Sequence, residues 1–439
     1  MKNFKLGFVG LLGVLPTTAW AGGFAINENS AADLGRANTA RVTQTQDASA
    51  VYGNPALMVK FDRLTISNTA SYITGDASFE DQGSVDLTAA SLGGDTDGFF
   101  ETAIVPALQL VYPISDNLAA GVSINAPYGL ASEYEDDWAG RYQGLKSELT
   151  TINVNPNIAV KINDRFSVGG GFNIQYAHAE LSSAVDFGAI CFAQIAPASC
   201  GPLGLTPQSA DGLLEITGDD WSFGYNFGAA YFPSPNLTIG VHYRSDIDHK
   251  IKGDADFTVP EAANILTSSG AFTDSDGNAD LPLPATLEAG FMWHITERVA
   301  LSSNIIHTNW SVLEEIRLDF DNPVQPDSAE ELNFKDALRY GVGLDFNVTK
   351  DCTLRAGYSF DEGAARAETR TVRIPDNDRD IFAFGAGYTG FDGWRIDAAF
   401  NRFSFKETEF SRIGPVGDRV VGIIKADVDV FSFGATKTF

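Results

Sequence analysis

The chain has 439 residues, of which 44% are apolar, yet its mean hydropathy is close to zero at −0.06. Apolar residues that alternate with polar ones produce this combination, as in a membrane barrel with a lipid-facing and a water-facing side. The 57 acidic and 30 basic residues give a formal net charge of −27, which argues against nucleic-acid partners because these bind basic grooves.

The first 21 residues read as a secretory signal. Lys2 and Lys5 give a basic start, residues 6–15 form an apolar core and residues 18–21 a cleavage site. A transmembrane anchor is the alternative, although this apolar run is too short to cross a bilayer. No later stretch reaches about 18 consecutive apolar residues, so the sequence predicts an exported protein without transmembrane helices.

Residues 22–62 have a different composition, which is small, polar and rich in Ala and Asn. This segment shows no strand alternation and contains a tight turn at Asn54-Pro55-Ala56. The strands predicted after it enclose a lumen wider than side chains alone can fill. We therefore expect the segment to be a plug inside a barrel, with a periplasmic tail as the alternative.

Residues 63–439 repeat a long alternating segment, a loop, a second long segment and a short turn. Short turns on one side and long loops on the other are typical of bacterial outer-membrane barrels. A soluble sandwich or propeller would show shorter strands at closer spacing. The sequence thus predicts an all-β fold, a 14-stranded antiparallel transmembrane β-barrel. Its strands are expected near 64–79, 98–114, 118–129, 149–162, 166–187, 219–233, 237–259, 283–295, 299–320, 335–348, 352–362, 380–390, 394–410 and 419–439, and its short turns at 115–117, 163–165, 234–236, 296–298, 349–351 and 391–393.

The alternation is clearest between residues 237 and 244, where apolar side chains mostly take the odd positions. We expect the odd residues there to face lipid and the even ones to face the lumen. The last strand ends on Phe439. An aromatic C-terminus resembles the signal by which outer-membrane barrels are recognised for assembly.

The sequence points to no enzyme, cofactor or metal. None of the five histidines stands in a Gly-x-Ser-x-Gly or His-Glu-x-x-His context. A Ser–His pair formed by folding stays open as an alternative and would make the barrel a surface lipase. The acidic residues at 133–137 are interpreted as a solvated loop, with a calcium site as the alternative. Residues 274–278 are interpreted as a loop, because they lack the distal Glu of a calcium site.

Cysteines are few. Cys191 and Cys200 lie nine residues apart in an exported chain, so we expect a loop-closing disulfide, with two free thiols as the alternative. Cys352 opens a strand-like segment and is interpreted as a small packing residue.

Two long loops, near 188–218 and 261–283, are rich in apolar residues. They could pack down as a cap over the barrel mouth, or form a landing groove for a hydrophobic ligand, since exposed apolar patches commonly mark binding sites. Their apolar residues are Ile190, Phe192, Ile195, Leu203, Leu205, Leu213, Leu214, Ile216, Ile265, Leu266, Phe272 and Leu281.

Several motifs, in order and at matching spacing, resemble those of one family over essentially the whole chain after the signal. This is the FadL family of outer-membrane long-chain fatty acid transporters, which also includes TodX-like channels for aromatic hydrocarbons. The motifs are Gly-Phe-Ala-Ile-Asn-Glu at 23–28, Leu-Gly-Arg-Ala at 34–37, Asn-Pro-Ala at 54–56, Tyr-Gly-Leu-Ala-Ser-Glu-Tyr at 128–134, Trp-Ala-Gly-Arg-Tyr at 138–142, Tyr-Arg-Ser at 243–245, Asn-Trp-Ser at 309–311, Phe-Lys-Asp-Ala-Leu-Arg at 334–339 and Ile-Pro-Asp-Asn-Asp-Arg at 374–379.

The resemblance implies a barrel closed by an N-terminal hatch, ligand capture between two external loops, a lumenal pocket and a change in the hatch that opens a path. It also implies an inward kink of the third strand that gives a side exit into the bilayer. Asn125-Ala126-Pro127-Tyr128 lies there, and a proline within a strand cannot donate to the ladder. An ordinary strand end is the alternative.

The chain departs from the family at the place where the ligand's carboxylate is met. Leu181-Ser182-Ser183 and Glu330-Glu331 stand where the resemblance implies basic side chains. Lys335, Arg339, Arg244 or His178 could substitute for them. This departure keeps uptake of aromatic or alkane hydrocarbons open as the alternative to uptake of fatty acids.

We predict a passive channel for hydrophobic compounds, foremost long-chain fatty acids, that acts as a monomer among the outer-membrane lipids of a Gram-negative bacterium. The sequence does not decide between a lateral exit into the bilayer and an exit into the periplasm. The predicted gate consists of Asn54, Pro55, Ala56, Asn125, Pro127 and Tyr128. The predicted ligand contacts are Phe24, Ile190, Phe192, Leu203, Leu205, Ile265, Leu266, Phe272, Arg244, Lys335 and Arg339.

Overall fold

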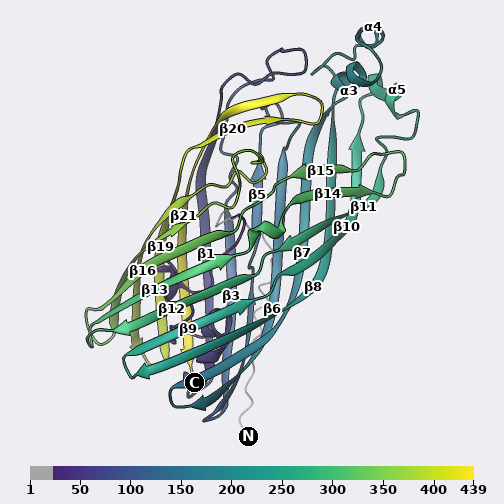
Figure 1. Ribbon diagram of the computed structural model, residues 1–439. Coiled ribbons are helices and arrows are strands. Elements are labelled where there is room, and N and C mark those ends of the chain that lie inside the picture. Colours follow the sequence, from purple (N-terminus) through teal and green to yellow (C-terminus); the bar gives the residue numbers. More distant parts are fainter. Residues whose placement is uncertain (1–22) are drawn as a thin grey trace.

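The computed structural model describes residues 23–439 (Figure 1). The predicted secretory signal at 1–21 lies outside these residues. Among the described residues, no helix combines the length and the apolar character needed to cross a membrane.

Across residues 23–439, fourteen antiparallel strands close into one barrel, as predicted (Figure 1). Eight strands are unbroken: β1 (Thr65–Asp81), β3 (Ala103–Ser115), β6 (Lys146–Asn163), β7 (Phe166–Asp186), β8 (Asp211–Ser234), β17 (Cys352–Asp361), β18 (Arg379–Phe391) and β21 (Arg419–Thr438). Six consist of two segments: β4 (Leu118–Asn125) with β5 (Gly129–Glu133), β9 (Leu237–Arg244) with β10 (Ile247–Thr258), β11 (Ser275–Leu283) with β12 (Thr286–His294), β13 (Val299–Thr308) with β14 (Glu315–Phe320), β15 (Ser328–Glu331) with β16 (Ala337–Asn347), and β19 (Trp394–Phe405) with β20 (Thr408–Ile413). The short strand β2 (Thr96–Asp97) lies in the first loop and pairs with β1.

Side chains alternate between lumen and membrane, as the sequence pattern predicted. In β9, Ile239 and Val241 are exposed, whereas Gly240, His242 and Arg244 are buried in the lumen. The exposed positions of the other strands also carry large apolar side chains. This outward apolar surface is the lipid-facing side of the barrel.

The two ends of the barrel differ (Figure 1). Turns such as residues 116–117 and 392–393 join strands at the end that carries the C-terminus, and the other predicted short turns lie there too. Longer loops join strands at the opposite end and carry α3 (Phe187–Gln194), α4 (Pro197–Cys200), η2 (Gly201–Leu203), η3 (Glu261–Ala263) and α5 (Asn264–Thr267). Short turns are periplasmic in such barrels, so the helical loops are external.

Two strands reach further outward than predicted. β8 begins at Asp211 and β11 at Ser275, so the predicted loops at 188–218 and 261–283 were wrong over their final residues. The cause is pairing with neighbours: Ile216 pairs with both β7 and β10, and Leu281 pairs with β10. Most of residues 274–278, interpreted as a loop, likewise belongs to β11.

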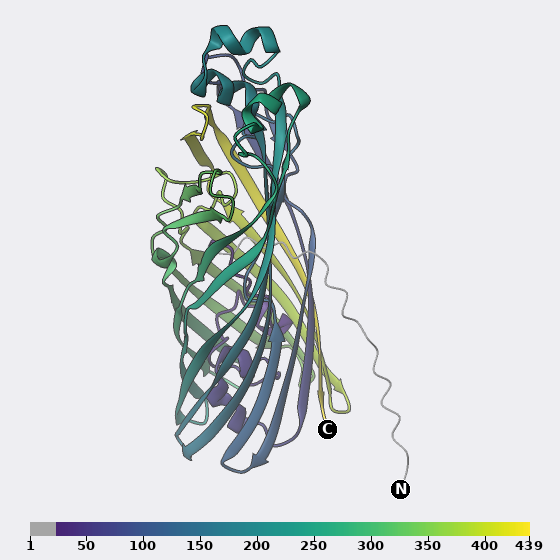
Figure 2. The ribbon, with the colours of Figure 1, turned by 90° about the vertical axis from the view of Figure 1, so that its right-hand side faces the viewer.

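Residues 23–60 lie inside the barrel (Figure 2). They form the short helices α1 (Ala31–Leu34), α2 (Ala50–Gly53) and η1 (Pro55–Lys60). The side chain of Ser30 caps α1 by accepting a hydrogen bond from the Asp33 N–H. α1 packs against β18 and β19, and η1 against β6 and β7. This position agrees with the predicted plug and not with a periplasmic tail.

Wall glycines let this N-terminal segment approach the strands closely. A Cβ atom at Gly240 would lie 1.9 Å from the carbonyl oxygen of Val42. One at Gly357 would lie 2.2 Å from the carbonyl carbon of Arg36. The partner atoms are backbone, so no side-chain rotation could relieve either clash. The segment is therefore fitted against the wall where only glycine leaves room.

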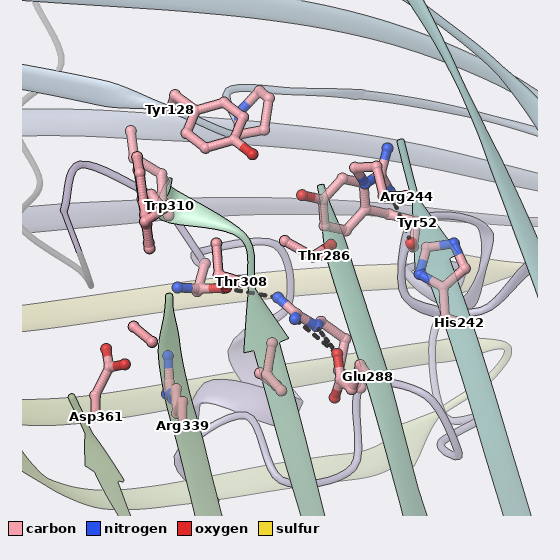
Figure 3. Close-up of a pocket in the computed structure, with 17 residues that line it drawn as sticks. Tyr52, Tyr128, His242, Arg244, Thr286, Glu288, Thr308, Trp310, Arg339 and Asp361 are labelled. Carbon is pink, nitrogen blue, oxygen red and sulfur yellow. Dashed lines mark hydrogen bonds and ion pairs between the residues drawn. The ribbon is translucent and has the colours of Figure 1, made fainter. Parts of the chain in front are cut away.

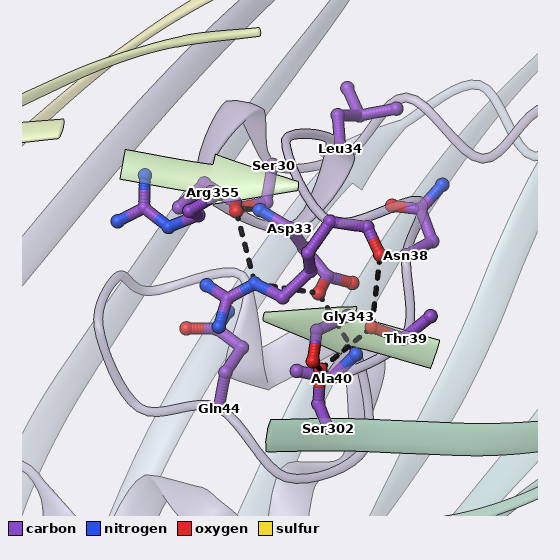
Figure 4. Close-up of polar contacts among 12 residues, drawn as sticks. Ser30, Asp33, Leu34, Asn38, Thr39, Ala40, Gln44, Ser302, Gly343 and Arg355 are labelled. Atoms are coloured by element: carbon purple, nitrogen blue, oxygen red, sulfur yellow. Dashed lines mark hydrogen bonds and ion pairs between the residues drawn. The ribbon is translucent and has the colours of Figure 1, made fainter. Parts of the chain in front are cut away.

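Buried polar contacts fix the segment to the wall (Figure 4). Nη1 of Arg36 lies 3.0 Å from a carboxylate oxygen of Asp345 in β16, and the Thr39 hydroxyl shares a 2.7 Å hydrogen bond with Ser302 in β13. Asp33 accepts a hydrogen bond from the Ala40 N–H at 3.1 Å. A buried charge that loses its partner is costly. Movement of the segment away from the wall therefore requires new partners for Arg36 and Thr39.

Candidate functional site

Three cavities follow one another along the lumen, and the strand direction gives their order. Ile316 and Leu318 lie toward the loop end of one two-segment strand, whereas Ile306 and Thr308 lie toward its turn end. We name the cavities by their linings. The outer chamber includes Tyr142, Leu181, Leu214, Ile216, Glu330, Arg373 and Arg412; the apolar chamber includes Phe24, Leu130, Leu149, Leu181, Ile216, Ile251, Leu281, Ile316, Leu318 and Ile374; the inner chamber includes Arg41, Tyr52, Tyr128, His242, Arg244, Glu288, Trp310, Arg339 and Asp361.

The apolar chamber is lined mainly by aliphatic side chains and lies between two chambers that contain arginine residues. Aliphatic side chains from β7, β8, β10, β11 and β14 line it, and Glu148 and Asp280 are its charged residues. Leu181, Ile216 and Leu318 also line the outer chamber, so the two spaces adjoin. Such a pocket suits a ligand with a long apolar body.

An aromatic cluster separates the apolar chamber from the inner chamber. The ring centroid of Phe24 lies 4.9 Å from that of Trp310 and 6.1 Å from that of Tyr128, both edge-to-face. Phe24 lines the apolar chamber, whereas Tyr128 and Trp310 line the inner one. The Tyr128 hydroxyl donates to the carbonyl of Pro284 at 2.9 Å. We call these three rings the aromatic seal.

The inner chamber is strongly polar (Figure 3). Nη2 of Arg41 lies 2.6 Å from a carboxylate oxygen of Glu288. Arg244 donates to the Tyr52 carbonyl at 3.1 Å and stacks over the same residue's ring, and Arg339 donates to the Ala37 carbonyl at 3.1 Å. The predicted ligand contacts Arg244 and Arg339 therefore lie together, on the far side of the seal from the apolar chamber.

The outer chamber carries a second set of charges. Nε of Arg373 lies 3.3 Å from a carboxylate oxygen of Glu330, and Nη2 of Arg412 lies 3.9 Å from the other oxygen. Burial lowers the pKa of Arg373, and the neighbouring Glu330 carboxylate opposes that shift. Basic side chains thus do lie beside the apolar chamber, but not at the positions where the family resemblance placed them.

The third strand is interrupted at the predicted place. Its ladder with β3 ends at Leu108 opposite Ile124, and the strand resumes at Gly129 as β5, which pairs with β6. The alternative of an ordinary strand end is therefore wrong. The N-terminal segment bonds to the interruption instead: the Ile26 N–H donates to the Pro127 carbonyl at 2.8 Å, and the Gly129 N–H donates to the Phe24 carbonyl at 2.9 Å.

The Asn54-Pro55-Ala56 turn holds the other end of the N-terminal segment. Asn54 Nδ2 donates to the carbonyls of Val42 and Ala229, each at 3.0 Å, and Asn54 Oδ1 accepts from the Ala56 N–H. The hydroxyl of Ser167 in β7 donates to the Ala56 carbonyl at 2.7 Å. The turn therefore ties the segment to both β7 and β8.

The predicted residues of the external loops pack against one another. Ile190, Leu205 and Leu266 are buried in one apolar cluster, with Phe192 and Phe272 packed against it. Cys191 and Cys200 form a disulfide within it. Leu203 and Ile265 remain about half exposed, at 48% and 50%. None of these predicted contacts lines the three chambers.

Lys335 and His178, two further candidates for pairing with the ligand's carboxylate, line none of the three chambers. Lys335 donates its backbone N–H to the Ala364 carbonyl and lines none of the three. In β7, Asn173, Gln175 and Ala177 are buried on the lumenal side. His178 follows them on the opposite face, so it is directed outward.

Sequence reasoning missed several residues of the chambers. Trp310 and Ile374 belong to the motifs at 309–311 and 374–379. Nothing in these motifs indicates that Trp310 lines the inner chamber or that Ile374 lines the apolar chamber. Arg373 directly precedes one of these motifs and carried no signal of its own. Arg412 is brought beside Arg373 by the fold, since Arg412 lies in β20 and Arg373 in the loop between β17 and β18.

Known proteins resemble this chain over nearly its whole length. Residues 12–439 match the family model described as outer membrane protein transport protein (OMPP1/FadL/TodX). The chain is 32% identical over 409 residues to the long-chain fatty acid transport protein of Escherichia coli O6:H1 (strain CFT073), with 91% of this chain and 90% of that protein covered. It is also 32% identical to the 47 kDa outer membrane protein of Pasteurella multocida (strain Pm70), with 92% of each covered.

Solved structures share the fold. A Pseudomonas aeruginosa FadL homologue matches with a TM-score of 0.85 at 25% identity, covering 95% of this chain and 100% of that one. The P. putida toluene transporter TodX matches with a TM-score of 0.72 at 16% identity, covering 94% and 99%. The protein is a β-barrel of the Gram-negative outer membrane, and it belongs to the OMPP1/FadL/TodX family of outer-membrane transport proteins.

Proposed function

We propose that this protein is a passive, ATP-independent channel for hydrophobic compounds, foremost long-chain fatty acids. The observation that carries the proposal is the apolar chamber, which adjoins the outer chamber on one side and ends at the aromatic seal on the other. The E. coli relative, named a long-chain fatty acid transport protein, supports this substrate class. The channel acts as a monomer, because one barrel holds the whole path, and outer-membrane lipid surrounds it.

The first step is capture at the external loops. The two loops contact each other through Phe187 and Phe272, whose ring centroids lie 5.2 Å apart. Ile195, Leu203 and Ile265 are exposed at this tip of the molecule. Exposed apolar side chains favour the adsorption of a hydrophobic molecule. The same loops can thus serve both as a cap and as a landing surface.

The second step is transfer into the apolar chamber. Each methylene of the ligand that leaves water there gains about 0.8 kcal/mol. The aliphatic residues shared by the outer and apolar chambers allow the alkyl chain to move inward without returning to water. Phe24 stops it at the seal.

The third step is release by movement of the N-terminal segment, which acts as a hatch. Phe24 belongs both to the seal and to the backbone pairing with the third strand. Its withdrawal opens the way to the inner chamber, where Arg244 and Arg339 can meet a carboxylate. It also frees the interruption at Pro127, which offers a lateral route to the bilayer. The Asn54-Pro55-Ala56 turn is the point about which the hatch is held.

Parallel binding of an acid and its methyl ester tests the substrate class. Purified protein in lipid nanodiscs would be titrated with radiolabelled oleate and with methyl oleate. We expect both to bind and oleate to bind more tightly, because only the acid can pair with an arginine. Equal affinities would count against the fatty acid assignment and favour a hydrocarbon channel. Binding of neither would contradict the proposed function.

A further inference from the structure

Glu330 occupies a position between two arginines. One of its carboxylate oxygens faces Arg373 and the other faces Arg412, at 3.3 and 3.9 Å. The side chains are 22%, 10% and 19% exposed for Glu330, Arg373 and Arg412, so all three are largely shielded from water. Two cations and one anion leave an excess of positive charge at this place.

The arginines are held by contacts that do not involve the Glu330 side chain. Nη1 of Arg373 donates to the Lys146 carbonyl at 2.9 Å and to the Ser147 hydroxyl at 3.1 Å. Nη1 of Arg412 donates to the Thr369 carbonyl at 2.8 Å. Backbone carbonyls therefore fix both guanidinium groups, and the site keeps its shape if the carboxylate between them is replaced.

The place of Glu330 matches that of a ligand's head group. Glu330 and both arginines line the outer chamber, and this chamber shares Leu181, Ile216 and other aliphatic residues with the apolar chamber. An amphipathic molecule whose tail fills the apolar chamber would thus carry its head toward the arginines. Glu330 itself stands on β15, a four-residue strand whose pairing is with β14, so its side chain can leave without breaking the barrel wall.

We propose that Glu330 is a built-in stand-in for the ligand's carboxylate, and that an acidic ligand displaces it to bind Arg373 and Arg412. The proposal rests on the proposed function, because it identifies the acid-selecting residues of that same path. The displaced Glu330 moves toward the solvent of the outer chamber. An ester or a hydrocarbon cannot replace its charge, so the arginines stay paired with Glu330 and give such ligands no head-group contact.

The test compares Glu330→Gln with the matched control Glu331→Gln. Glu331 is the next residue on β15, and its carboxylate accepts a hydrogen bond from Asn333 rather than lying between the arginines. Glutamine keeps the size of the side chain and removes the competing charge. We expect Glu330→Gln to tighten oleate binding by about threefold to tenfold and to leave methyl oleate unchanged, whereas Glu331→Gln should change neither.

A second variant separates the role of the charge from that of the fold. Arg373→Gln should weaken oleate binding and leave methyl oleate binding unchanged, with heat-modifiable gel mobility as the check on barrel integrity. Unchanged or weaker oleate binding in Glu330→Gln would overturn the inference, as would equal tightening of acid and ester. If the wild-type protein binds neither compound, the proposed function fails first and the inference fails with it.

Discussion

Two seams of the barrel wall are built in opposite ways. The closing seam between β1 and β21 is paired without a register shift from Thr65 opposite Thr438 to Asp81 opposite Gly422. The seam between β3 and the third strand is paired only as far as Leu108 opposite Ile124. Beyond that point, a bridge between Phe100 and Ser132 joins the two sides.

The two seams differ because the N-terminal segment takes over part of the hydrogen bonding where the ladder between β3 and the third strand is missing. At the third strand, the N-terminal segment supplies backbone hydrogen bonds to Pro127 and Gly129, on either side of Tyr128. The closing seam is thus permanent, whereas the state of the third-strand seam depends on the position of the segment. Because Phe24 and Tyr128 belong to the same contact, the seam and the aromatic seal are expected to change together.

Deletion of residues 23–39 should have the largest effect. It removes Phe24 from the seal and every backbone bond that the segment makes to the third strand. The closing seam is untouched, so we expect a folded, heat-resistant barrel. Uptake of radiolabelled oleate by a host lacking its own channel should be abolished, because the apolar chamber loses Phe24 from its lining and opens to water, so it no longer holds the ligand.

Gel mobility before and after heating checks folding of the deletion variant. Planar-bilayer conductance is a second measure, and it should rise because the lumen is less completely filled, with α2 and η1 still in place. Unchanged oleate uptake by a folded deletion variant would contradict the hatch.

Gly357→Ala should have a smaller effect of the same kind. The new methyl group meets the backbone of Arg36, and overpacking of this sort costs about 1–3 kcal/mol. The segment should be held less firmly, so ligand-independent conductance should rise several-fold, yet stay below that of the deletion variant. Gly201→Ala is the matched control, because open space surrounds that glycine. Equal conductance of Gly357→Ala and the wild type would show that the segment is not seated by this contact.

The wall of the barrel could be predicted from the sequence because its pattern is local. Alternation with period two and turns such as Asp392-Gly393 act within a few residues, so the number of strands and the lumenal face of β9 were confirmed. The strand ends were less predictable. The sequence predicts loops at Leu213–Ile216 and Leu281, because apolar character alone does not indicate whether these residues pair with a neighbouring strand. Pro127 marked the interruption correctly, since the loss of its N–H is a property of the residue itself.

The chambers were much less predictable, because they are made by contacts across the lumen. From the sequence, the apolar loop residues Ile190 and Leu266 could either line a groove or pack against each other. The structure shows that they pack in one cluster. One arginine of the outer chamber comes from a loop and the other from β20, and no spacing in the sequence joins Arg373 to Arg412. The sequence shows Glu330 only as an acid where a basic residue is expected, since its role depends on those two partners.

A reversible cross-link between the segment and the third strand tests the central claim most directly. Ala25 lies opposite Tyr128 in an antiparallel bridge, where cysteines can form a disulfide. The variant is Ala25→Cys with Tyr128→Cys in a Cys352→Ser background, and that background alone is the control for effects of the reductant. We predict that oleate uptake is lost when the pair is oxidised and returns on reduction, because the segment can then leave the seam. Equal uptake in both states, with the cross-link verified by mass spectrometry, would contradict the claim that the segment must move for transport.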